Sequence, residues 1–258
     1  MKKDLEYMLG KKRAGCPITM VTAYDYPSAS ILDEADIDAI LVGDSVGTNC
    51  LGYASEREVT INDMLHHTSA VCRAAKSAFV IADLPYGCAD DMDSALRGSQ
   101  MLTGCGADCV KVEGWGEKTA AIEKLTGSGV AVCAHMGYNP QIHDKPKVFG
   151  KDAEQAAALL DGAKALCGAG AKLIVLEMVP AELSAQISRA LPIPVIGIGS
   201  GNRCDGQVLV INDLLGLSRK IFKHARPFAN LREKMYEAFK DYADAVRSRE
   251  FPGDENSW

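Results

Sequence analysis

One short run of the chain, Leu173-Ile174-Val175-Leu176-Glu177, consists of four apolar residues followed by a carboxylate. Similar runs recur along the sequence, and they are continuous rather than alternating in polarity. Continuous apolar runs of this length are typical of parallel strands that are buried on both faces. We therefore expect strands at Ile18–Tyr24, Ala39–Asp44, Phe79–Leu84, Cys109–Glu113, Val130–His135, Leu173–Glu177, Pro194–Gly199 and Gln207–Ile211.

The segments between these strands carry apolar residues at helical spacing. We expect helices at Tyr26–Ala35, Asn62–Ala75, Asp91–Thr103, Glu117–Thr126, Asp152–Cys167 and Ala181–Ala190, with Asn62, Asp91 and Asp152 as N-caps. Strands that alternate with helices in this way predict a (β/α)8 TIM barrel, and the alternative is a doubly wound open sheet. The seventh unit is the weakest, because only residues 202–206 are available for its helix.

We expect a single domain over residues 1–258. Its barrel is followed by a C-terminal helix near Leu231–Arg247 and a short acidic tail at Phe251–Trp258. A chain of about 250 residues suits one barrel of this class.

The charge balance excludes several kinds of partner. The formal net charge is −6, so neither nucleic acid nor an anionic membrane surface is an expected partner. The basic runs Lys2–Lys3 and Lys11–Arg13 are short, and we interpret them as a solvated N-terminal segment. The sequence has neither a signal-peptide h-region nor an apolar run of membrane-spanning length, which favours a soluble cytoplasmic protein.

The chain has nine cysteines, an odd number, and none of them forms a C-x-x-C pair. No cysteine and histidine cluster has the spacing of a zinc site. We interpret the cysteines as small buried hydrophobes in a reducing cytosol.

Polar residues end five of the predicted strands in succession. They are Asp44, Asp83, Lys111 with Glu113, His135 and Glu177. Because the carboxyl ends of barrel strands converge on one rim, these side chains should meet in space. Three neighbouring carboxylates need a cation, and an oxygen-rich site favours Mg²⁺. The structural alternative is that each carboxylate only caps a following helix or turn.

Strand geometry suggests roles for some of these residues. Lys111 and Glu113 are two residues apart, so they face the same side, and Lys111 can take a substrate carboxylate. Glu177 lies in an apolar run that suits a general base. His135 can hydrogen-bond a substrate oxygen or carry a proton, although a satisfied core histidine is the alternative.

The ordered blocks of the chain resemble those of the ketopantoate hydroxymethyltransferase family. The matching blocks are Thr22–Tyr26, Leu41–Ser45, Ala82–Pro85, Val110–Gly114, Leu176–Pro180, Pro194–Gly199 and Asp205–Val210. The resemblance runs from about Ile18 to the C-terminal tail, and seven blocks in order are more specific than any single motif.

This resemblance implies a (β/α)8 barrel that transfers a hydroxymethyl group from 5,10-methylenetetrahydrofolate to 3-methyl-2-oxobutanoate in pantothenate and coenzyme A biosynthesis. The product is 2-dehydropantoate, and Mg²⁺ stabilises an enolate. By resemblance, Asp44 and Asp83 bind the metal, with Glu113 on the metal or one water away. The substrate-binding residues are Asp44, Ser45, Asp83, Lys111 and His135, and Glu177 is the base. The family also implies a homo-oligomer, often a decamer.

The chain departs from the family in two places. The segment Gln141–Gly150 is shorter than expected and lacks a glycine pair, and Thr48 stands where Met is expected. The alternative function is a Mg²⁺-dependent 2-oxo-acid lyase or mutase of the phosphoenolpyruvate mutase and isocitrate lyase type. The Lys-Lys-Cys-Gly-His loop of isocitrate lyases does not occur here. A non-catalytic barrel is a third hypothesis.

Overall fold

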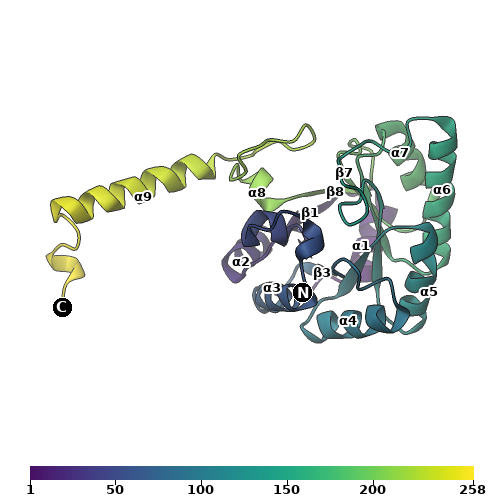
Figure 1. Cartoon of the computed structure of the whole chain (residues 1–258), viewed down its shortest axis with the longest axis horizontal. Coiled ribbons are helices and arrows are strands. Elements are labelled where there is room, and N and C mark those ends of the chain that lie inside the picture. The colour runs from purple at the N-terminus through teal and green to yellow at the C-terminus, as the bar shows by residue number, and fades with distance from the viewer. The chain divides into compact units, whose positions relative to one another are not determined.

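The computed structural model describes residues 1–258 and contains a closed barrel of eight parallel strands in chain order (Figure 1). The strands are β1 (Ile18–Thr22), β2 (Ala39–Val42), β3 (Phe79–Asp83), β4 (Cys109–Glu113), β5 (Val132–Gly137), β6 (Leu173–Glu177), β7 (Val195–Ile198) and β8 (Gly206–Leu209). β8 pairs with β1 and closes the barrel. The predicted strands and the barrel are thereby confirmed, and the open-sheet alternative is wrong.

The chain forms two compact units, residues 1–210 with the barrel and residues 211–258. The expectation of one domain over residues 1–258 stays a prediction. The helices of the first unit are α1 (Leu5–Arg13), α2 (Tyr26–Glu34), α3 (Ile61–Ala74), α4 (Met92–Gly104), α5 (Thr119–Gly127), α6 (Ala153–Gly168) and α7 (Ala181–Ala190). Residues 199–205 connect β7 to β8 without a helix, as the short seventh unit suggested.

Two of the three predicted N-caps are confirmed. The side chain of Asp91 accepts a hydrogen bond at the start of α4, and Asp152 does so at the start of α6. The prediction of Asn62 is wrong, because α3 begins earlier with Thr60 as its cap. Thr60 and Asp63 form a reciprocal capping box, which satisfies two of the helix's free N–H groups.

Alternate residues of the strands fill the barrel interior. Apolar side chains from all eight strands form one core, and the cluster includes Cys109 and Cys133. Both are fully buried in this apolar setting, which confirms the interpretation of these two cysteines as small hydrophobes. The same interpretation is wrong for Cys16 and Cys50, which are exposed. Met8 of α1 joins the same cluster and is 1% exposed, so α1 packs across the amino end of the barrel.

The expectation of a solvated basic N-terminal segment holds for Lys2 and Arg13, which are exposed, but is wrong for its other lysines. Lys3 donates to the carboxylate of Asp36 and is only 8% exposed. Lys12 forms an ion pair with Asp205 at 2.5 Å. Its neighbour Lys11 binds Asp38 at 2.7 Å. The ion pairs of these lysines therefore hold α1 and the residues before it against the amino ends of the strands.

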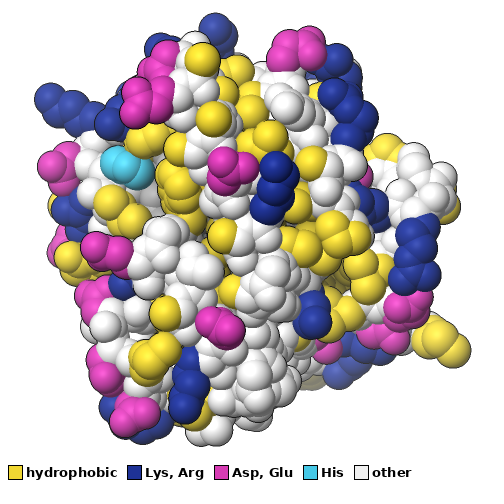
Figure 2. Space-filling view, turned by 90° about the vertical axis from the view of Figure 1, so that its right-hand side faces the viewer, with side chains coloured by type: hydrophobic (Ala, Val, Ile, Leu, Met, Phe, Trp, Pro, Cys, Tyr) yellow, Lys and Arg dark blue, Asp and Glu magenta, His cyan; other side chains and the backbone are white.

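Basic and acidic side chains are intermixed over the face shown in Figure 2, so no purely basic patch covers it. This agrees with the net charge of −6. None of the helices combines the length and the apolar character that crossing a bilayer requires.

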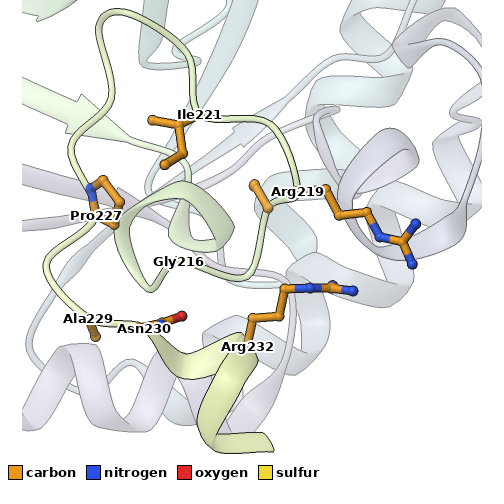
Figure 3. A pocket seen from close by; sticks show the side chains of 8 residues that line it. Gly216, Arg219, Ile221, Pro227, Ala229, Asn230 and Arg232 are labelled. Carbon is orange, nitrogen blue, oxygen red and sulfur yellow. The ribbon is translucent and has the colours of Figure 1, made fainter. Parts of the chain in front are cut away.

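The second unit contains the short helix α8 (Ile211–Leu214) and the long helix α9 (Leu231–Ser248). The loop between them surrounds an open pocket whose lining includes Arg219, Ile221, Pro227 and Arg232 (Figure 3). Its lining contains neither a carboxylate nor a histidine. The predicted site residues lie in the first unit, on the strands of the barrel and directly after them.

Asp38 gives a test of how α1 is held. Its carboxylate accepts hydrogen bonds from Lys11, Thr19 and Tyr7, and its side chain is 3% exposed. Burial acts to raise the pKa of Asp38, but the hydrogen bonds, led by that of Lys11, bring the pKa below its ordinary value. The charged form therefore stabilises the fold above the unfolded-state pKa of about 3.9, and this stability is lost as pH falls through the lower folded-state pKa.

We expect Asp38→Asn to lower the free energy of unfolding by about 1–3 kcal/mol near neutral pH. The difference from the native chain should shrink as pH falls below about 4. Urea unfolding at several pH values measures both effects. Glu6→Gln is the control, because its exposed pair with Arg13 should contribute less than about 1 kcal/mol. An unfolding free energy for Asp38→Asn equal to that of the control would contradict this account.

Candidate active site

Three carboxylates meet at the carboxyl end of the barrel. Asp44 follows β2, Asp83 ends β3 and Glu113 ends β4. One oxygen from each lies within 4.8 Å of the others. None of the three residues is more than 4% exposed. The structure therefore brings together the residues that the sequence predicted as metal ligands.

The strand register explains which side chains touch. Asp83 is paired with Lys111 across β3 and β4, and Glu113 is paired with His135 across β4 and β5. Paired residues of neighbouring strands point to the same face, so their side chains meet inside the barrel. The Nζ atom of Lys111 lies 3.0 Å from Asp83 and 2.7 Å from Glu113. The Nδ1 atom of His135 lies 2.9 Å from Glu113.

Burial and close charges shift the pKa of each group. Burial raises the pKa of Asp44 well above its ordinary value, and the charges of Glu113 and Asp83 raise it further. Burial also raises the pKa of Asp83, although Lys111 opposes this. Glu113 is buried too, but Lys111 and His135 hold its pKa below the ordinary value.

The basic groups are shifted by the same carboxylates. Burial disfavours the charge of Lys111, yet Asp83 and Glu113 together raise its pKa well above the ordinary value. Burial likewise opposes the charge of His135, but the nearby Glu113 raises the pKa of His135 to about 9. Lys111 and His135 are thus two basic partners for three buried carboxyl groups, so the acidic groups outnumber the basic ones.

The donor set fits a hard divalent cation. Asp83 Oδ1 is buried and has no hydrogen-bond partner, which is costly for a carboxylate oxygen. A Cβ atom at Gly43 would lie 2.9 Å from Ser45 Oγ and 3.6 Å from Asp83 Oδ2, so glycine keeps this space open. Carboxylate oxygens are the ligands that Mg²⁺ prefers. A cation among Asp44, Asp83 and Glu113 would satisfy both the free oxygen and the excess charge.

Glu177 lies beside this cluster, at the end of β6. Its Oε2 atom is 3.3 Å from Nε2 of His135, but this ring nitrogen has no partner with hydrogen-bond geometry. The Glu177 side chain is 17% exposed, so it lies between the buried cluster and solvent. His135 Nε2 and Glu177 Oε2 therefore lie next to each other at the edge of the cluster, where both can face one substrate.

The backbone around Glu177 is held in an unusual conformation. Met178 has φ 52°, in the left-handed region that a non-glycine residue rarely adopts. Gly137 packs so closely that a Cβ atom there would lie 2.1 Å from the carbonyl oxygen of Glu177. Tyr138 donates its backbone N–H to the same oxygen at 2.8 Å. The end of β5 therefore fixes the position of Glu177.

The side chain of Ser45 contacts Tyr24 of the first strand unit and not the three carboxylates. Its Oγ atom lies 2.8 Å from the hydroxyl of Tyr24, which also accepts a hydrogen bond from Thr22. Burial raises the pKa of Tyr24 well above its ordinary value, so it acts as a neutral hydroxyl. Tyr24 belongs to a block that carried the family resemblance, but the sequence did not predict it as a site residue.

A second residue that sequence reasoning missed is Gln141. Its side chain donates to Asp44 at 2.8 Å, across 97 positions of the chain. The only signal was its place in the segment that departs from the family pattern. No periodicity or strand end marked it.

Two solved structures illustrate the likeness in fold. A phosphonopyruvate hydrolase in complex with oxalate and Mg²⁺ has a TM-score of 0.66 at 12% identity, covering 99% of this chain and 93% of that one. A 2,3-dimethylmalate lyase has a TM-score of 0.63 at 16% identity, covering 98% and 90%. At these identities the likeness concerns the fold alone.

Curated relatives are much closer in sequence. The 3-methyl-2-oxobutanoate hydroxymethyltransferase of Carboxydothermus hydrogenoformans is 45% identical over 96% of this chain and 92% of its own length. That of Geobacillus kaustophilus is 46% identical over 97% and 91%. The family model described as ketopantoate hydroxymethyltransferase matches residues 2–254. The match covers nearly the whole chain, and the fold is the barrel that the sequence predicts. The chain therefore belongs to the ketopantoate hydroxymethyltransferase family.

Proposed function

We propose that this protein transfers a hydroxymethyl group from 5,10-methylenetetrahydrofolate to 3-methyl-2-oxobutanoate and so makes 2-dehydropantoate. The observation that carries the proposal is the buried cluster of Asp44, Asp83 and Glu113, with Glu177 at its edge, in a chain of this family. The reaction breaks the C3–H bond of the oxo acid and joins C3 to the one-carbon unit. Water supplies the hydroxyl oxygen, and tetrahydrofolate leaves.

Asp44, Asp83 and Glu113 would hold Mg²⁺. When bound, the ion supplies Lewis-acid stabilisation of the negative charge that develops on the 2-oxo group. A C–H bond beside a ketone is too weakly acidic for a carboxylate base alone, so this stabilisation is needed.

Lys111 and Ser45 would bind the carboxylate of the oxo acid. An ammonium group has three donors, and Lys111 directs Nζ to two carboxylates, which leaves a donor for the substrate. The Ser45 hydroxyl is oriented by Tyr24 and remains partly exposed. Both groups would hold the substrate with its C3 atom toward Glu177.

Glu177 would act as the general base, and His135 beside it would bind the substrate. A base must lie within hydrogen-bond reach of the proton that it removes, and the partly exposed Glu177 carboxylate borders the opening. The free Nε2 of His135 would donate to a substrate oxygen. This use explains an imidazole nitrogen that is buried without a hydrogen-bond partner.

The alternative of a 2-oxo-acid lyase or mutase has only a likeness at 12–17% identity beside it, and that likeness concerns the fold and not the reaction. The hydroxymethyltransferase proposal is supported by relatives at 42–46% identity over nearly the whole chain. Conversion of the oxo acid without any folate would favour the alternative.

The same resemblance leads us to propose a homo-oligomer, a decamer in the family pattern. The exposed face of α9 supports assembly. Met235, Phe239, Tyr242 and Val246 recur at spacings of three and four residues, and each is at least 41% exposed. A helix with such an apolar stripe normally packs against a partner.

We also propose a cytoplasmic location, since nine free cysteines suit a reducing compartment.

The central test is product formation from 3-methyl-2-oxobutanoate and methylenetetrahydrofolate, with Mg²⁺ or with a chelator. We expect product with Mg²⁺ and none with the chelator. Asp83→Ala should reduce kcat/KM at least about 100-fold, because it removes a proposed metal ligand. Asp161→Ala, at an exposed position on α6, is the control. Turnover of Asp83→Ala equal to that of the control would refute the metal role.

Glu177→Gln tests the base. The amide keeps the shape of the side chain but cannot accept the C3 proton, so exchange of that proton with D₂O should slow by roughly 10²–10⁴-fold. Proton NMR of 3-methyl-2-oxobutanoate in D₂O, without folate, measures the exchange. Glu182→Gln is the matched control, because Glu182 is exposed and pairs with Arg203. Undiminished exchange in Glu177→Gln would rule out this residue as base.

Phe239→Asp tests the assembly. A charge in the middle of the apolar stripe should weaken self-association, so the molar mass from light scattering after size exclusion should fall. Glu237→Gln changes a residue on the opposite side of α9 and should leave the mass unaltered. An unchanged mass for Phe239→Asp would show that this stripe is not an oligomer contact.

A further inference from the structure

We propose that Gln141 is a positioning residue of the metal site, which holds one oxygen of Asp44 and leaves the other to the cation. The inference rests on the Mg²⁺ site of the proposed function. It concerns the connection between β5 and α6, where this chain departs from the pattern of its family.

Gln141 lies in a loop, yet it is only 9% exposed. Its Nε2 atom donates to Asp44 Oδ2 at 2.8 Å and to the carbonyl oxygen of Leu84 at 3.1 Å. Its backbone N–H lies 2.9 Å from Asn139 Oδ1 and 3.4 Å from Glu113 Oε2. One loop residue therefore contacts two of the three carboxylates of the cluster.

The chemistry of its partners fixes the orientation of the amide. A carboxylate oxygen and a carbonyl oxygen are both acceptors, so only the NH₂ group of Gln141 can face them. Both of its donors are then used. Rotation of the Asp44 carboxylate would break the shorter of these bonds, so the amide holds that carboxylate in one orientation.

Gln141 is also held from outside the cluster. Arg57, in the short 3-10 helix Glu56–Glu58 between β2 and α3, donates from Nε to the carbonyl oxygen of Gln141 at 2.9 Å. The same guanidinium forms an ion pair with Asp144 at 3.0 Å. The backbone on which the amide depends is therefore anchored by a second connecting segment. Groups that orient metal ligands commonly contribute 10- to 100-fold to affinity, so this arrangement should matter for the metal.

The test is the affinity of the full-length protein for Mg²⁺, measured by calorimetry without substrate. Gln141→Met keeps the length of the side chain and removes its donors. We expect Mg²⁺ to bind about 10- to 100-fold more weakly. Lys145→Gln is the matched control, because it changes an exposed residue of the same loop that takes no part in the contacts of Gln141, Arg57 and Asp144. Its affinity should equal that of the native chain.

The outcomes separate this inference from the proposed function. Equal Mg²⁺ affinity in Gln141→Met and the native chain would overturn the role of Gln141 and leave the metal site standing. Failure of the native chain to bind Mg²⁺ would overturn the proposed function and this inference with it.

A crystal structure of the native protein with Mg²⁺ gives an answer even if Gln141→Met does not fold. We expect Asp44 to bind the ion through one oxygen while the other still accepts from Gln141. Coordination of the ion by both oxygens of Asp44, with the amide displaced, would overturn the inference.

Discussion

Three carboxylates share a volume that water hardly reaches, and a single lysine stands between two of them. Isolated charges in such a place would lose several kcal/mol of solvation each, so they persist only where opposite charges lie within hydrogen-bond distance. Lys111 and His135 supply part of that compensation. The geometry follows from the barrel, because the strand register sets Asp83 beside Lys111 and Glu113 beside His135. Closure of the sheet therefore creates both the crowding of charge and most of its relief.

The two ends of the barrel handle charge differently. At the amino end, each acidic group has its own partner: Asp38 binds Lys11 and Asp205 binds Lys12. At the carboxyl end, the carboxylates outnumber their partners and one oxygen of Asp83 has none. Strain is found at that end too, in the positive φ of Met178. The ion pairs at the amino end stabilise the barrel. This stability can offset the cost of the unpaired carboxylates and the strained backbone at the carboxyl end.

The sequence predicted the barrel because each strand is a continuous apolar run with a polar end, a pattern that depends only on neighbouring residues. The same pattern predicted the meeting of Asp44, Asp83 and Glu113, since barrel strands point their carboxyl ends to one rim. It failed for α1, whose apolar residues are few and whose lysines looked solvated. Their partners, among them Asp38 and Asp205, come from distant parts of the chain.

Gln141 and Tyr24 were missed for the same reason. A glutamine in a loop and a tyrosine after a strand have no local property that marks them, and their importance comes from contacts across the fold. The neighbouring residues in the sequence reveal that a residue lies at the end of a strand. They do not reveal which distant side chain it contacts, because that contact forms only in the closed barrel.

The packing of α1 has a consequence for how small molecules travel. Met8 packs into the interior core, and Lys11 and Lys12 of α1 form ion pairs near the starts of the strands. Helix α1 therefore closes the amino end of the barrel. The interior beneath the carboxylates is filled with apolar side chains, and no channel through it is needed. A ligand of the carboxylate cluster would therefore have to arrive and depart at the same end of the barrel, the carboxyl end.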